Sequence, residues 1–176
     1  MFKRRVDPLK KSVETLYYLR LMRDKITSIH DRISERRNML YEKLVELEEK
    51  GERYLARRYA EEIVKLDKLL HRLALLRLIT EKIDLALQYA IVTRDFNQLV
   101  SELKPLIRDL SKLPELNIPD IGMVFAELES SLRELGEMSV SDVITYDVHS
   151  SSEIKSILEE AKEVLKKRLE PENITS

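Results

Sequence analysis

The longest run of this chain without a strong helix breaker constrains its fold more than any other feature. No proline occurs between Pro8 and Pro105, and Gly51 is the only glycine in the first 121 residues. The run is rich in Leu, Ile, Glu, Lys and Arg, which favour helix, so one glycine divides it into two helical arms of about forty residues. At about 1.5 Å per residue, each arm would be roughly 60 Å long. Such arms favour lateral contacts with other surfaces over the enclosure of a catalytic cavity.

Both arms carry apolar residues at helical spacing, which predicts an antiparallel hairpin with Gly51 at its tip. We expect the arms to span residues 9–50 and 52–94. The stripe of the first arm contains Leu19, Met22, Ile26, Ile29, Ile33, Leu40, Leu44 and Leu47. The stripe of the second contains Leu55, Tyr59, Ile63, Leu66, Leu70, Leu73, Leu76, Ile83, Leu87 and Ala90. We expect further helices to cover a second apolar edge of this arm, made by Leu69, Leu75, Leu78, Leu85 and Ile91.

The rest of the chain predicts three shorter helices. The first spans residues 97–112 and includes Pro105, and the second spans 120–135 and stops at Gly136. Residues 137–152 are rich in serine and predict a linker, after which Ser151 and Ser152 would cap a final amphipathic helix. That helix is either a detachable element or a fixed fifth helix.

The predicted fold class is therefore all-α. It consists of a long antiparallel helical hairpin, two shorter helices packed on its distal half, a linker and a C-terminal amphipathic helix. The predicted domains are a helical core over residues 1–136, the linker over 137–152, and the C-terminal helix and tail over 153–176.

Charge is distributed unevenly along the chain. The formal net charge is −1, but residues 1–43 carry +6, residues 44–94 carry +1 and residues 95–176 carry −8. This gradient is either a chance solvation of different faces or a means for the acidic C-terminal part to fold back on the basic N-terminal part. In the second case the acidic part would compete with an anionic partner.

The N-terminal segment combines an aromatic residue with cations. We predict membrane binding by Phe2, Lys3, Arg4, Arg5, Lys10 and Lys11. The ring would enter the bilayer interface while the cations attract anionic lipid; the alternative is a solvated terminus. The longest stretch without charge has nine residues, 85–93, against about 20 for a membrane-spanning helix. We therefore expect a cytoplasmic protein that binds peripherally at the inner membrane face.

Two charged rows run along the first arm in matching register. The basic row is Lys25, Arg32, Arg36 and Lys43, and each of these is directly preceded by an acid of the second row, Asp24, Asp31, Glu35 and Glu42. At about 100° per residue the rows form parallel ridges. We predict that they are polymer contacts between copies of the chain, the alternative being a solvated face.

Signals for catalysis are absent from the sequence. No phosphate-binding glycine loop, nucleophile elbow or Glu-x-x-His pair occurs, and cysteine is absent, so we predict no enzyme activity and no cofactor. Asp67 and His71 lie four residues apart but supply too few ligands for a metal site. Binding of nucleic acid is disfavoured because the acidic row offsets the basic one.

The layout resembles the ESCRT-III family, and in particular its archaeal CdvB-type cell-division subunits. The best local match is the hairpin tip, Glu49-Lys50-Gly51-Glu52-Arg53-Tyr54-Leu55-Ala56-Arg57-Arg58-Tyr59-Ala60. Near the C-terminus, Leu165, Arg168 and Leu169 are similar to the Leu-x-x-Arg-Leu core of a motif read by the MIT domain of an AAA ATPase. Residues 113–116 resemble the proline-type form of that motif, although a linker between helices is the simpler interpretation.

The resemblance implies a filament-forming, membrane-associated subunit for membrane remodelling and scission in cell division. Its implied partners are itself and paralogous subunits, an anionic membrane surface and an AAA ATPase with an MIT domain, and its implied location is the division site. The alternative is a soluble coiled-coil adaptor that binds a partner protein through its C-terminal helix without membrane contact.

Overall fold

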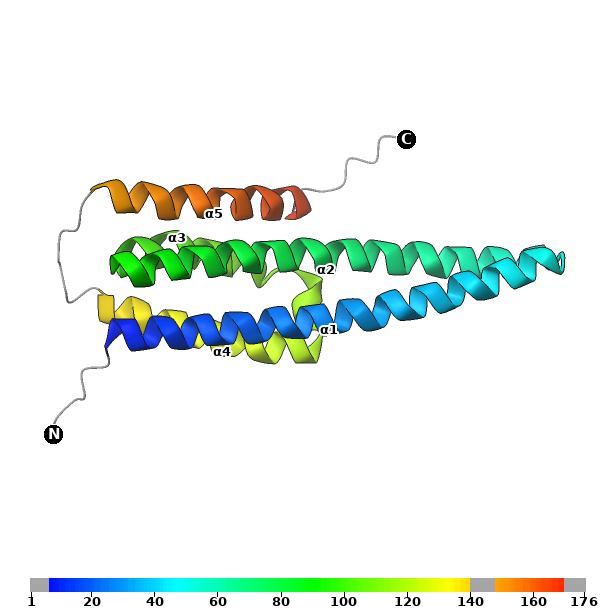
Figure 1. Cartoon of the computed structure of the whole chain (residues 1–176), viewed down its shortest axis with the longest axis horizontal. Coiled ribbons are helices and arrows are strands. Elements are labelled where there is room, and N and C mark those ends of the chain that lie inside the picture. The colour runs from blue at the N-terminus through cyan, green and yellow to red at the C-terminus, as the bar shows by residue number, and fades with distance from the viewer. Residues whose placement is uncertain (1–6, 140–147, 170–176) are drawn as a thin grey trace. The chain divides into compact units, whose positions relative to one another are not determined.

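All secondary structure in the described residues is helical. The computed structural model of the chain describes residues 7–139 and 148–169. In order, the elements are α1 (Pro8–Glu49), α2 (Arg53–Thr93), α3 (Phe96–Leu110), the 3₁₀ turn η1 (Pro114–Asn117), α4 (Pro119–Ser139) and α5 (Val148–Leu169) (Figure 1). The predicted all-α class is confirmed.

The chain divides into two compact units. The tip unit is Asp24–Arg77, and the bundle unit comprises the described residues of Met1–Arg23 and Leu78–Ser176. Residues from both α1 and α2 contribute to each unit, and each unit holds an ion pair between these helices. In the tip unit Arg37 Nε lies 3.0 Å from Asp67 Oδ1, and in the bundle unit Arg20 Nε lies 2.9 Å from Asp84 Oδ2.

Backbone chemistry explains both ends of α1. Asp7 caps the helix, because its Oδ1 accepts a hydrogen bond from the Leu9 amide at 3.0 Å, and Pro8 occupies the first helical position. At the other end Gly51 has a φ of +74°. The amide of Glu52 reaches the Leu47 carbonyl at 3.0 Å, which forms the left-handed cap that glycine favours. The chain then reverses into α2, as the hairpin prediction requires.

The core of the bundle unit joins the three shorter helices to residues 7–23 and 78–93 of the hairpin. The apolar residues that α4 buries are Ile121, Phe125, Leu128, Leu132 and Leu135, and those of α5 are Ile154, Leu158, Ala161 and Leu165. From α3 the buried residues are Leu99, Leu103, Leu106, Ile107 and Leu110. Figure 1 shows α5 running alongside α3, and these two helices make direct contact.

Two expected helix limits are wrong. Helix α4 does not stop at Gly136 but continues to Ser139. A glycine inside a helix costs only about 1 kcal/mol relative to alanine, and the adjacent Leu132 and Leu135 are buried. Helix α5 begins at Val148, so Ser151 and Ser152 lie inside it and do not cap it. Serine disfavours a helix interior by only about 0.5 kcal/mol, too little to fix a helix start. The remaining part of the predicted linker, 140–147, lies outside the described residues.

The apolar edges of α2 also differ from expectation. Leu55 is 43% exposed whereas Ala56 is buried, and Leu78 and Leu85 remain exposed. Each exposed leucine lies beside the buried face of α2, just outside it. The bundle unit covers instead the face that carries Ile79, Ile83, Ala86 and Leu87.

Candidate functional site

The C-terminal motif is partly buried in the bundle unit. Leu165 is 2% exposed, while Leu169 is 39% exposed. A cavity of about 420 Å³ lies where the end of α5 meets α3, and both leucines line it together with Pro105 and Leu106. The motif that resembles an ATPase-binding sequence is thus turned toward α3 through Leu165 and toward solvent through Leu169.

Arg168 of the same motif forms a buried ion pair. Its Nη2 donates to Glu115 Oε1 at 2.6 Å, and the two side chains are only 9% and 1% exposed. Glu115 belongs to η1, where Pro114 begins the turn. Glu115 Oε2 and Arg168 Nη1 are also buried, and neither has a hydrogen-bond partner in the described part of the chain. The pair therefore joins α5 to η1 through one strong hydrogen bond, and the second carboxylate oxygen and the second terminal nitrogen do not add another.

Two further ion pairs hold α5 in place. Lys162 Nζ lies 2.5 Å from Glu102 Oε2 of α3, and Lys82 Nζ of α2 lies 2.5 Å from Glu160 Oε2. These pairs are more exposed than the pair of Arg168 and contribute less each. Together with the apolar stripe, they place α5 against α2, α3 and η1.

The two described members of the predicted membrane-binding group lie in different environments. Lys10 is exposed on the first turns of α1, whereas Lys11 is 8% exposed and forms ion pairs with Glu134 of α4 and with Glu14. Hydrogen bonds to Glu134 and Glu14 raise the pKa of Lys11 above its usual value. Its ammonium is therefore committed to the bundle unit. Phe2, Lys3, Arg4 and Arg5 lie outside the described residues.

All residues of the two predicted charged rows are exposed on α1 in the tip unit. Some have neighbours within the chain: Asp31 Oδ1 lies 3.7 Å from His30 Nδ1, and Lys43 Nζ lies 3.9 Å from Glu46 Oε2. The two rows are brought together as adjacent ridges of one helix, as their spacing predicts. Their role as polymer contacts stays a prediction.

Sequence reasoning missed a buried charged cluster between α1 and α2. Asp84 is 5% exposed and accepts hydrogen bonds from Arg20 and Gln88, and Arg23 Nη1 lies 3.7 Å away. Burial alone raises the pKa of Asp84, but the hydrogen bonds from Arg20 and Gln88 and the nearby positive charges outweigh it and hold this pKa below its usual value. The available signal was the place of Asp84 directly after Ile83, at the edge of the apolar stripe.

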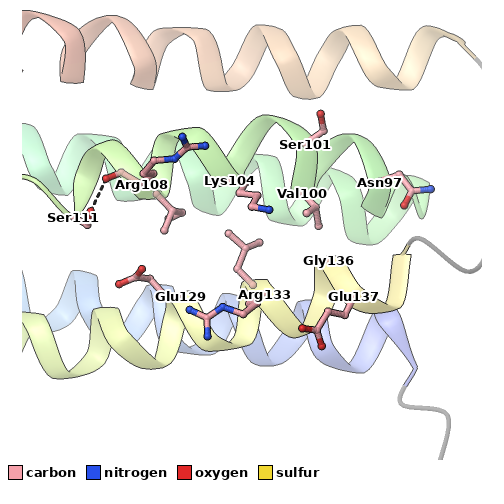
Figure 2. Close-up of a pocket in the computed structure, with 12 residues that line it drawn as sticks. Asn97, Val100, Ser101, Lys104, Arg108, Ser111, Glu129, Arg133, Gly136 and Glu137 are labelled. Carbon is pink, nitrogen blue, oxygen red and sulfur yellow. Dashed lines mark hydrogen bonds between the residues drawn. The ribbon is translucent and has the colours of Figure 1, made fainter.

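A groove of about 670 Å³ lies between α3 and α4 (Figure 2). Its floor, called here the groove floor, is Val100, Ile107, Leu132 and Gly136. Lys104 and Arg108 of α3 form the basic wall, and Glu129 and Glu137 of α4 form the acidic wall. Figure 2 shows Arg133 between the two acids on the α4 side, and the small Gly136 opposite Val100.

The described architecture is a helical hairpin with three shorter helices, the last of them held against the bundle by ion pairs, and it agrees with the ESCRT-III layout that the sequence resembles. No family model matches the chain, and no solved structure matches it. One relative is Cell division protein B1 of Sulfolobus acidocaldarius, which is 31% identical over 173 residues, covering 93% of this chain and 78% of that protein.

This chain belongs to the archaeal CdvB-type branch of the ESCRT-III family. That relative is a cell-division protein, and ESCRT-III is not a family of enzymes. Within the described ranges, no helix is both long enough and apolar enough to cross a membrane.

Proposed function

We propose that this chain is a filament-forming subunit that associates with membranes and remodels them during cell division. In this proposal the described arrangement is the closed form of the subunit, and release of α5 is the step that permits assembly. The observation that carries the proposal is the attachment of α5: Leu165 and Arg168 are buried against α3 and η1 by a contact that involves one strong hydrogen bond.

The C-terminal motif would have a different contact in each state of α5: Glu115 in the closed form and an external partner after release. While Arg168 pairs with Glu115, its side chain is only 9% exposed and its guanidinium does not meet an external partner. After release, Leu165, Arg168 and Leu169 form one exposed helical edge. An AAA ATPase with an MIT domain is the partner that this motif suggests, so the closed form hides the motif from the ATPase.

The exposed charged rows of α1 support self-association. They are exposed on a long helix, and rows of opposite sign suit contacts between copies or with paralogous subunits. The anionic membrane surface is the partner proposed for the basic N-terminal residues. Lys10 is the one described residue of that group whose ammonium is exposed. The proposed location is the cytoplasmic face of the membrane at the division site.

The test compares the wild-type chain with a variant in which α5 cannot pack. Leu158→Asp places a charge at a side chain that is 0% exposed and should release α5. The matched control is Ser156→Asp, at an exposed position of the same helix. Sedimentation with anionic liposomes at low and high salt, followed by electron microscopy, should show more membrane-bound filaments for Leu158→Asp than for the wild type or the control.

Absence of both lipid binding and filaments in every variant would refute the proposal. Discrete oligomers that form without lipid would favour the soluble adaptor instead. Binding of DNA or RNA with a steep dependence on salt would favour a nucleic-acid partner.

A further inference from the structure

The charges on the two walls of the α3–α4 groove, two cations on the α3 side and two acids with Arg133 between them on the α4 side, are not used in ion pairs within residues 7–139 and 148–169. Lys104 and Arg108 lie four residues apart, about 6 Å along the axis of α3. Neither they nor Glu129 and Glu137 form an ion pair with another described residue. Two like charges four residues apart mildly destabilise a helix, and an occupant of opposite charge would offset this cost. The groove therefore favours an occupant with an acidic ridge beside a basic one.

Helix α1 of the tip unit presents such a surface. Asp31 and Glu35 are exposed and also lie about 6 Å apart along their helix. Arg32 and Arg36 follow them directly and form the adjacent basic ridge, which is exposed as well. The spacing of the acidic ridge thus equals the spacing of the basic wall.

An exposed apolar side chain stands between these ridges. Met39 is 64% exposed, although a methionine is usually buried. It lies four residues after Glu35 and three after Arg36, so on a helix it borders both. A flexible thioether at this place is suited to fill an irregular apolar surface such as the groove floor.

We propose that the α3–α4 groove of one copy receives this face of α1 from a second copy. The acidic ridge would lie along the basic wall, the basic ridge along the acidic wall, and Met39 against the groove floor. This inference rests on the proposed self-assembly and deepens it, because it names both surfaces of one contact between copies. In this contact the charged rows of two copies do not pair with each other. Instead, each row pairs with one wall of the groove.

The order of the charges also restricts the direction of the docked helix. Turning α1 end for end exchanges the sides on which its two ridges lie, so one direction pairs opposite charges at both walls and the other pairs like charges. If α1 and α3 run parallel, Ser28 comes opposite Ser101 when Asp31 faces Lys104. If they run antiparallel, Glu35 faces Lys104 and Asn38 comes opposite Ser101. Ser28, Asn38 and Ser101 are all exposed.

Charge reversal tests the pairing. Lys104→Glu with Arg108→Glu should raise the protein concentration needed for assembly by about tenfold or more, because two attractions become two repulsions. Asp31→Lys with Glu35→Lys should do the same, and all four substitutions in one chain should restore assembly to within about threefold of wild type. The matched control is Lys68→Glu with Arg72→Glu, an exposed pair at the same spacing on α2. Assembly is read by sedimentation and by electron microscopy of the full chain.

Disulfide trapping tests the geometry, and the absence of native cysteine makes it clean. The Ser101→Cys chain is mixed under oxidising conditions either with the Ser28→Cys chain or with the Asn38→Cys chain. A covalent mixed dimer should form in one mixture and not in the other. Because each chain carries one cysteine, such a dimer is necessarily a contact between copies.

The outcomes separate this inference from the proposed function. Failure to assemble in both the wild type and the released Leu158→Asp variant refutes both. Assembly that survives reversal of the basic wall, or that is lost equally in the Lys68 and Arg72 control, refutes the groove contact alone. The groove contact is also refuted if the fourfold variant does not recover assembly. Equal disulfide trapping in both mixtures, or trapping in neither, refutes it as well, and the groove would then serve a different partner.

Discussion

Replacing Arg168 with methionine tests whether the buried ion pair holds α5 closed. The substitution keeps a long apolar stem but leaves Glu115, 1% exposed, with a buried carboxylate and no cation. Removing one partner of a buried ion pair costs about 3–5 kcal/mol. The contact here is one hydrogen bond of 2.6 Å, and Glu115 Oε2 and Arg168 Nη1 have no partner among the described residues, so we expect the lower end of that range.

The cost falls on the closed form alone. When α5 leaves, Glu115 becomes accessible to water and no longer requires a partner, so the closed form loses about 3 kcal/mol relative to the open form. Because 1.36 kcal/mol corresponds to a factor of ten, opening of α5 should become roughly 100-fold more frequent. The measurement is hydrogen exchange of the backbone amides of residues 153–169, which reports local opening.

Two variants control the experiment. Lys167→Met changes an exposed neighbour on the same turn and should leave exchange unchanged. Glu115→Leu combined with Arg168→Met replaces the pair by apolar side chains and should restore protection, because such replacements are often neutral or stabilising. Exchange in Arg168→Met within about threefold of wild type, or equal acceleration in Lys167→Met, would refute the reasoning.

Three further predictions concern the hairpin and its supports. Asp84→Asn should flatten the dependence of stability on acid pH. Because the pKa of Asp84 is lowered in the folded chain, its carboxylate contributes stability above the usual pKa of 3.8, and this contribution is lost as pH falls through the folded pKa. Urea midpoints between about pH 5 and 2 should therefore fall less in the variant than in the wild type. Gly51→Ala should reduce the free energy of unfolding by about 1–2 kcal/mol through its positive φ alone, because nothing lies within 4 Å of the added methyl group. Gly122→Ala should destabilise more than Gly51→Ala in the same denaturant titration, because its methyl group would overlap the backbone carbonyl oxygen of Leu116; an equal loss would contradict this steric argument.

The helices and the hairpin follow from local sequence, and for that reason they were predictable. A run with a single glycine and no proline has few alternatives to two long helices, and the position of Gly51 fixes where they meet. Gly136 shows the limit of such signals. A lone glycine does not end a helix when the leucines beside it are buried, and burial depends on distant elements.

The candidate site was predictable only in part. The residues of the C-terminal motif were identifiable, but the partner of Arg168 lies 53 positions earlier, in a segment whose prolines predicted a linker. No local pattern connects the two. Asp84 was missed for the same reason, since its partners Arg20 and Arg23 are on the other arm. By contrast, the exposed rows of α1 depend on spacing within one helix, which the sequence gives directly.

In the proposed function, the Arg168 guanidinium serves either the contact with Glu115 or the contact with an external partner, and this links the two contacts thermodynamically. A partner that reads Leu165 and Arg168 binds only the fraction of molecules in which α5 is free, so its apparent dissociation constant is its intrinsic value divided by that fraction. If the closed form is favoured about 100-fold, the apparent affinity is about 100-fold weaker than the affinity for the open helix. Each bound partner in turn holds its subunit in the open form, so binding draws the population away from the closed form. Glu115, which never touches that partner, thereby sets how tightly the partner binds.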